Sequence, residues 1–202
     1  MSENELINEI DKLKKSDIKQ VIDKRVNEFA NISRDFNSLF RELSFCILTA
    51  GTSAELGIKT ISHLGKTLFT GNLEDIQKKL KEAYRFHTIR AGYLYNARNE
   101  FKKIDVNHKN IRDLLVQNIK GLGMKEASHF LRNIGFKDFA IIDFHIIDVL
   151  TRYNLIKKPK TLTAKRYLEI EGVLKKLANK LKMSLGELDL YLWYLETGKV
   201  LK

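Results

Sequence analysis

Apolar residues recur at the spacing of an α-helix along almost the whole chain. The sequence has one proline, Pro159, and lacks the sustained alternation of Val, Ile and Thr that indicates strands. Its 202 residues, 44% of them hydrophobic, suffice for one large domain or two small ones. The pattern therefore predicts an all-α protein. We expect helices near residues 3–14, 17–30, 36–50, 53–64, 72–82, 86–101, 110–119, 124–134, 143–152, 163–181 and 185–197.

Two glycines, Gly121 and Gly123, flank Leu122 between two of these predicted helices. Glycine allows a tight turn and a close approach of the backbone to another group. A turn that opens directly into a helix presents free N–H groups at the positive end of the helix dipole, where a phosphate oxygen binds well. The segment therefore predicts a helix-hairpin-helix that contacts phosphate.

Lys125 lies in the first turn of the second hairpin helix. The helix dipole disfavours an ammonium ion there and so favours the neutral, nucleophilic amine. Asp143 follows eighteen residues later, inside an apolar run that begins another helix. Two interpretations of Asp143 are compatible: a helix N-cap, and a carboxylate that faces Lys125. A solvated lysine that contacts phosphate is the alternative for Lys125.

The net charge of +11 favours nucleic acid as a partner, although lysine-rich surfaces also have other origins. We expect no membrane association and a cytoplasmic location, because the N-terminal residues have a helix pattern and not that of a signal peptide. The lone Cys46 excludes an intrachain disulfide and a four-cysteine cluster. We expect no cofactor and no side-chain metal site, because the histidines lack metal-ligand spacing.

The chain order suggests two helical lobes. Residues 86–152 hold the hairpin and the candidate reactive residues, and residues 1–85 together with 153–202 would form the other lobe. A cleft between two such lobes is the default place for a ligand.

Several segments resemble the helix-hairpin-helix glycosylase superfamily of base-excision repair, and within it the compact, archaeal-type 8-oxoguanine DNA glycosylases. The similarity covers nearly the whole chain. The segments that carry it are Lys120–Ala127, Ile142–His145, Phe40–Ala50, Arg85–Ala91, Lys125–Asn133 and Leu188–Lys202.

The resemblance implies a helix-hairpin-helix fold and a bifunctional enzyme, a DNA glycosylase and abasic-site lyase. Lys125 matches the family's nucleophile and Asp143 its essential carboxylate. The damaged base would be flipped out of the duplex, displaced from the sugar by the amine, and the resulting Schiff base would allow β-elimination. The expected partner is double-stranded DNA that contains 8-oxoguanine, and the expected state is a monomer.

The resemblance also assigns residues to base and phosphate recognition. Phe86 and Trp193 match the aromatic residues that sandwich the flipped base, and the terminal Lys202 matches a residue that lies close to it. Judged by period alone, both aromatic residues are ordinary core residues. Gly121, Gly123 and His145 match phosphate contacts, while a core histidine is the equal alternative for His145.

The chain departs from the family pattern at Gly51, where relatives commonly have Asn or Gln to fill the gap left by the flipped base. Thr52 and Ser53 are the candidates for that role here. Ile141-Ile142 replaces the Gly-Pro that precedes Asp143 in many relatives. Two other functions stay open: a non-catalytic hairpin protein that binds DNA, and a glycosylase for oxidised pyrimidines. The single Cys46 argues against a typical member of the latter group.

Overall fold

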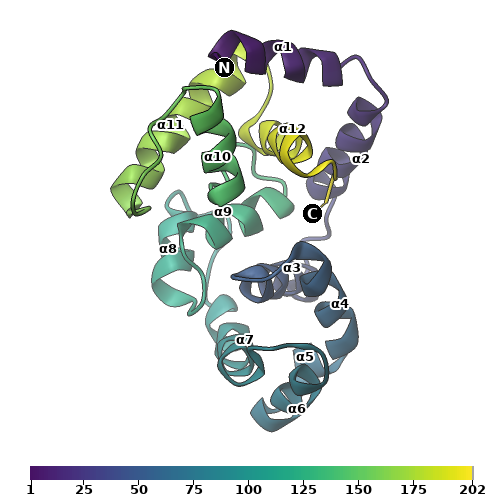
Figure 1. Cartoon of the computed structure of the whole chain (residues 1–202). Helices are drawn as coiled ribbons and strands as arrows, with labels where there is room; N and C mark the ends of the chain where they lie inside the picture. The colour runs from purple at the N-terminus through teal and green to yellow at the C-terminus, as the bar shows by residue number, and fades with distance from the viewer. Residues whose placement is uncertain (202) are drawn as a thin grey trace. The chain divides into compact units, whose positions relative to one another are not determined.

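The computed structural model describes residues 1–201, which fold into twelve α-helices (Figure 1). The helices are α1 (Glu3–Leu13), α2 (Ile18–Ala30), α3 (Phe36–Thr49), α4 (Ala54–Leu64), α5 (Thr67–Thr70), α6 (Leu73–Ala83), α7 (His87–Phe101), α8 (Ile111–Asn118), α9 (Met124–Asn133), α10 (Phe144–Arg152), α11 (Ala164–Leu181) and α12 (Leu185–Thr197). The predicted all-α fold is confirmed. In the described part, no helix is long and apolar enough to cross a membrane.

Most helix boundaries follow local sequence signals. Asn72 caps α6 in a reciprocal capping box with Asp75, and Ser184 accepts the Glu187 N–H at the start of α12. Gly198 ends α12 in the left-handed conformation. The eleven predicted helices are all present, whereas the four-residue α5 was not predicted because one turn is too short to show a period.

One compact unit comprises Met1–Asn31 and the chain from Leu131 onward. Its central element is α12, drawn in yellow in Figure 1, which packs against α1, α2, α10 and α11. The helix has buried residues around its circumference, as a helix enclosed by neighbours must. Tyr191 of α12 is fully buried in this core. The unit carries Asp143, His145 and Trp193.

The second compact unit comprises Ile32–Phe130. Its core element is α3, whose residues from Leu39 to Thr49 are buried except for Arg41. Helix α3 packs against α4 and α7, and α6 packs against α4 and α7. Phe101 and Phe130 meet edge to face with ring centroids 5.6 Å apart, which ties α9 to α7. This unit carries Phe86, the hairpin and Lys125.

These units differ from the lobes expected from the sequence, residues 86–152 against the rest. The division falls elsewhere because α3, α4 and α6 pack with α7 and therefore join the hairpin. Helix α9 begins in the Ile32–Phe130 unit and ends in the other one. The predicted lobe boundaries relied on chain order alone, which does not reveal that packing.

Candidate active site

The hairpin between α8 and α9 is a tight turn that requires glycine at position 121. Gly121 has a φ of +94°, and an added Cβ would lie 2.6 Å from Cδ2 of Tyr93. The Leu122 N–H donates to the Ile119 carbonyl over 3.2 Å and closes the turn. The Leu122 side chain is buried and anchors the turn to the unit. The geometry predicted from the Gly-Leu-Gly spacing is therefore present.

Glu126 caps the start of α9. Its Oε2 accepts the Gly123 N–H over 3.2 Å, and its Oε1 lies 3.9 Å from Nζ of Lys125. An acidic residue in the first turn of a helix satisfies a free amide and interacts favourably with the helix dipole. The Gly123 amide, which the sequence assigned to phosphate, is thus occupied by a carboxylate in this structure. Glu126 was not singled out as a site residue from the sequence.

Lys125 extends from α9 with 24% of its side chain exposed. The opposite face of the helix is held in the core, where Ala127 and Phe130 are fully buried. His129, one turn further along α9 from Lys125, contacts Phe45 edge to face at 5.5 Å. The Lys125 side chain therefore projects from a firmly packed helix and is partly accessible to a ligand.

Asp143 is the N-cap of α10, and its Oδ1 accepts the Ile146 N–H over 3.0 Å. The cap uses one carboxylate oxygen, so Oδ2 is the oxygen available for chemistry. The side chain is half-buried. The capping role predicted for Asp143 is confirmed, and it fixes the carboxylate at the helix terminus.

The segment that leads into Asp143 is held by two side chains of α11. The Tyr167 hydroxyl donates to the Ala140 carbonyl over 2.6 Å and accepts the Ile142 N–H over 3.2 Å. Glu171 accepts the Ala140 N–H over 3.0 Å. Because buried backbone groups need partners, these bonds set the path of the chain just before the cap. Sequence reasoning missed both residues, since their contacts span 25 to 31 positions.

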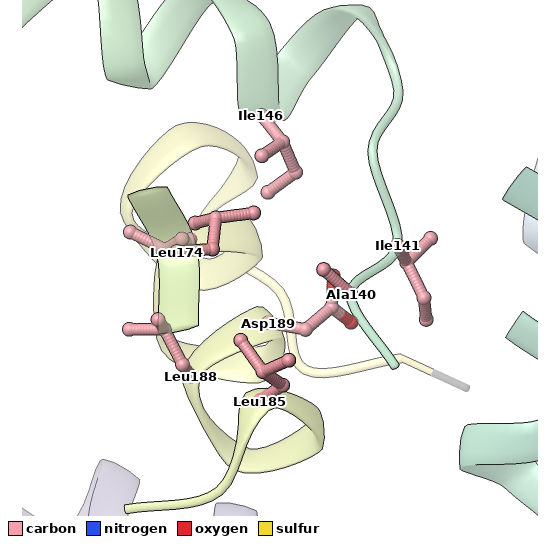
Figure 2. Close-up of a pocket in the computed structure, with 8 residues that line it drawn as sticks. Ala140, Ile141, Ile146, Leu174, Leu185, Leu188 and Asp189 are labelled. Carbon is pink, nitrogen blue, oxygen red and sulfur yellow. The ribbon is translucent and has the colours of Figure 1, made fainter. Parts of the chain in front are cut away.

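Ala140 and Ile141 of this segment help to line a small pocket (Figure 2). It is bounded by Ile146 of α10, Leu174 of α11, and Leu185 and Leu188 of α12. Asp189 is its one charged lining residue, and its Oδ2 lies 3.5 Å from Nη1 of the buried Arg132. A purine needs several hydrogen-bonding groups for recognition, so we interpret this pocket as core packing and not as a base site.

His145 contacts two aromatic rings. Its ring centroid is 4.0 Å from that of Phe144 and 4.8 Å from that of Trp193, with the Trp193 plane nearly perpendicular at 87°. His145 and Trp193 are half-buried, and 66% of Phe144 is exposed. The two predicted site residues His145 and Trp193 are therefore neighbours, which their separation in the sequence did not indicate.

Phe86 is the N-cap of α7 and is half-buried. The guanidinium carbon of Arg85 lies 4.4 Å from the centroid of its ring, a cation–π contact. In the same unit, Nη2 of Arg90 donates to the Ala50 carbonyl over 2.7 Å. The start of α7 is thereby tied to the turn that follows α3.

That turn contains the candidates for filling the gap in the duplex. The Thr52 hydroxyl donates to the Leu48 carbonyl over 2.7 Å, and Ser53 caps α4 by accepting the Leu56 N–H. Both hydroxyls are therefore committed to helix ends. Gly51 has a φ of +78°, and an added Cβ would meet nothing within 4 Å. Position 51 is therefore the place on this turn where nothing lies close to an added Cβ.

The predicted site residues fall into both compact units. Lys125, Gly121, Gly123 and Phe86 belong to the Ile32–Phe130 unit, and the residues Asp143, His145 and Trp193 belong to the other. That the Asp143 carboxylate faces Lys125 stays a prediction. Lys202 lies outside the described residues. Among the residues that are described, no cluster of three His, Cys, Asp or Glu side chains is arranged to hold a metal ion.

The sequence profile of a family described as 8-oxoguanine DNA glycosylase matches residues 22–183, which include the hairpin, Lys125 and Asp143. The chain belongs to this family. The resemblance that was drawn from the hairpin and the C-terminal segment is confirmed.

Individual members of the 8-oxoguanine DNA glycosylase family match over nearly the full chain. The 8-oxoguanine DNA glycosylase/AP lyase of Methanocaldococcus jannaschii is 48% identical over 98% of this chain and 99% of its own length. The enzyme of the same name from Aquifex aeolicus is 44% identical over 92% of this chain and 95% of its own length.

Solved structures of glycosylases in this family also share the fold. The M. jannaschii 8-oxoguanine glycosylase/lyase, crystallised with a 15-mer DNA containing 8-oxoguanine, has a TM-score of 0.92 and 46% identity. That match covers 98% of this chain and 99% of the other. The Thermotoga maritima 8-oxoguanine DNA glycosylase has a TM-score of 0.91 and 40% identity, over 99% of this chain and 100% of the other. The helix-hairpin-helix glycosylase fold is thereby established.

Proposed function

We propose that this protein removes 8-oxoguanine from duplex DNA and then nicks the strand at the abasic site. The observation that carries the proposal is the end-to-end similarity to enzymes named 8-oxoguanine DNA glycosylase/AP lyase, at 45% and 48% identity. The hairpin supports it independently, because a glycine turn followed by a half-buried lysine has the residues that a DNA-directed amine nucleophile needs.

Lys125 is the proposed nucleophile. Its neutral amine attacks C1′ of the damaged nucleotide, the bond from C1′ to the base breaks, and the base leaves with the electron pair of that bond. Loss of the amine proton and opening of the sugar give a Schiff base between Nζ and C1′. Abstraction of a proton from C2′ then expels the 3′ phosphate by β-elimination, and hydrolysis releases Lys125.

Asp143 is the proposed carboxylate partner of this reaction. Its Oδ1 accepts the Ile146 N–H, so the cap orients the carboxyl group. The negative charge stabilises positive charge that develops on the sugar, or accepts a proton from the attacking amine. Because Tyr167 and Glu171 fix the preceding segment, the position of the carboxylate depends on α11 as well as on α10.

Backbone phosphate is the proposed ligand of the hairpin and of His145. The net charge of +11 supplies the general attraction to DNA. At Gly123 a phosphate oxygen would replace Oε2 of Glu126, which accepts that N–H here. The proposal is supported by the carboxylate at this place, because an amide that binds one anion can bind another.

The flipped base is proposed to stack between Phe86 and Trp193, with Lys202 close to it. Arg85 lies over the Phe86 ring, so a base would use the other ring face. Stacking supplies affinity that tolerates any base, and polar groups would have to distinguish 8-oxoguanine from guanine. The proposed partner is double-stranded DNA, bound by one copy of the chain.

A strand-nicking assay tests this function. A labelled duplex with one 8-oxoguanine opposite cytosine should be nicked, and the matched duplex with guanine should stay intact. Lys125→Gln should bind the damaged duplex and fail to nick it. Lys103→Gln is the matched control, because Lys103 is an exposed lysine paired only with Glu100 among the described residues. A wild-type protein that cuts a duplex with an oxidised pyrimidine and spares 8-oxoguanine would refute the proposed substrate.

A further inference from the structure

The only tryptophan of the chain, Trp193, has no hydrogen bond from its indole nitrogen in the described part of the structure, although that nitrogen is buried. A buried indole N–H usually has a partner that helps to fix the ring. Within residues 1–201, the contacts that orient Trp193 are therefore packing contacts. The aromatic neighbour that the structure gives it among residues 1–201 is His145.

The contact between His145 and Trp193 is directional. The ring centroids are 4.8 Å apart and the planes are nearly perpendicular, the edge-to-face geometry that aromatic pairs prefer. The Phe144 ring is a second aromatic neighbour of the imidazole, with ring centroids 4.0 Å apart. His145 itself is in the first turn of α10, two residues after the Asp143 cap. The imidazole is thus held at a fixed helix terminus and can in turn hold the indole.

We propose that His145 is a positioning residue for Trp193: it holds the indole in the orientation in which it stacks on the flipped base. The inference rests on the proposed function, in which Trp193 contacts the base. It adds to the phosphate contact expected of His145 a second role that acts through a neighbouring side chain. His145 then contributes both to binding of the DNA backbone and, through Trp193, to binding of the flipped base.

The two roles separate when the substrate has no base. A duplex with a preformed abasic site still needs the phosphate contact, but it offers nothing to stack on Trp193. A duplex with 8-oxoguanine needs both. Loss of the positioning role should therefore slow base excision more than it slows cleavage at the abasic site, and the ratio of the two rates measures the difference.

Two substitutions separate the aromatic ring of His145 from its hydrogen-bond donor. His145→Gln keeps a polar donor and removes the ring, whereas His145→Phe keeps a ring and removes the donor. The ratio of excision to abasic-site cleavage should fall about threefold to tenfold in His145→Gln, the range expected for one aromatic pair. His145→Phe should keep the wild-type ratio, even where the loss of the donor slows both reactions.

Trp193 also gives a spectroscopic signature, because its fluorescence reports on this one position. The anisotropy of the tryptophan emission should fall in His145→Gln, since the ring becomes more mobile, and should stay at the wild-type value in His145→Phe. Circular dichroism and thermal unfolding establish that each variant is folded before it is compared.

A double-mutant cycle completes the test. Trp193→Ala should lower the same ratio, and adding His145→Gln to Trp193→Ala should lower it no further. Equal slowing of both reactions by His145→Gln with unchanged anisotropy would overturn the inference, as would additive effects in the cycle. Failure of the wild-type protein to excise 8-oxoguanine would instead overturn the proposed function and this inference with it.

Discussion

The Tyr167 hydroxyl holds the backbone segment that precedes Asp143 through two hydrogen bonds. It bonds both the Ala140 carbonyl and the Ile142 N–H, and all three residues are buried. Tyr167→Phe removes one oxygen atom and leaves both backbone groups without that partner. The substitution changes the packing volume little, so its effect reports on the two hydrogen bonds.

The magnitude follows from the number of groups affected. A buried polar group left without its partner costs about 1–3 kcal/mol. With two such groups and partial relaxation of the segment, the free energy of unfolding should fall by about 2–4 kcal/mol. For a chain of this size the unfolding midpoint should fall by roughly 5–15 °C. Excision measured well below that midpoint should slow by about tenfold or more, because the segment leads directly into Asp143.

Thermal and urea unfolding measure the stability, and the nicking assay measures the excision rate. Tyr191→Phe is the matched control in the same unit, because the Tyr191 hydroxyl is buried without a hydrogen-bond partner in the described part. Burial, with a smaller contribution from Glu187 and Asp23, raises the pKa of Tyr191 to about 12. Loss of the Tyr191 hydroxyl should leave the free energy of unfolding unchanged or raise it. A Tyr167→Phe protein within about 0.5 kcal/mol of wild type would refute the reasoning.

Three further predictions concern the hairpin, the cap and an acid-sensitive helix terminus. Gly121→Ala should weaken binding to undamaged duplex and lower stability by about 1–3 kcal/mol, because Gly121 has a φ of +94° and an added Cβ would clash with Tyr93. Gly123→Ala should have a smaller effect in the same binding titration. Asp143→Asn should keep the cap and the unfolding midpoint yet lose most excision activity; full activity would remove the need for a charge. Hydrogen bonds from Ser33 and Ser38 hold the pKa of Asp35 well below its usual range. The stability that this depressed pKa contributes is present above the unfolded-state pKa of about 4 and is lost below it, so the unfolding free energies of wild type and Asp35→Ala should converge in acid.

The helices were predictable from the sequence because each depends on local signals. Amphipathic periods and caps such as Asn72 operate within one helix, and the hairpin glycines determine their own turn. The missed α5 is a single turn, where such signals are weakest. The family could be recognised because the hairpin and the C-terminal segment are distinctive in sequence.

The supporting contacts were not predictable, because they join distant parts of the chain. Tyr167 meets Ala140 across 27 positions, and nothing in either local pattern indicates the pairing. The contact of His145 with Trp193 arises because α10 packs against α12, which periodicity does not specify. The capture of the Gly123 N–H by Glu126 is local, and the Glu in the first turn of α9 was the signal that could have indicated it.

Borohydride trapping tests the central claim, that Lys125 forms a Schiff base with DNA at 8-oxoguanine. Borohydride reduces such a linkage to a stable amine, which appears as a slower band on a denaturing gel. We expect an adduct between the wild-type protein and a labelled duplex with 8-oxoguanine opposite cytosine, none with guanine in that position, and none with Lys125→Gln. An adduct of equal yield with Lys125→Gln would contradict the account, because another amine would then be the nucleophile.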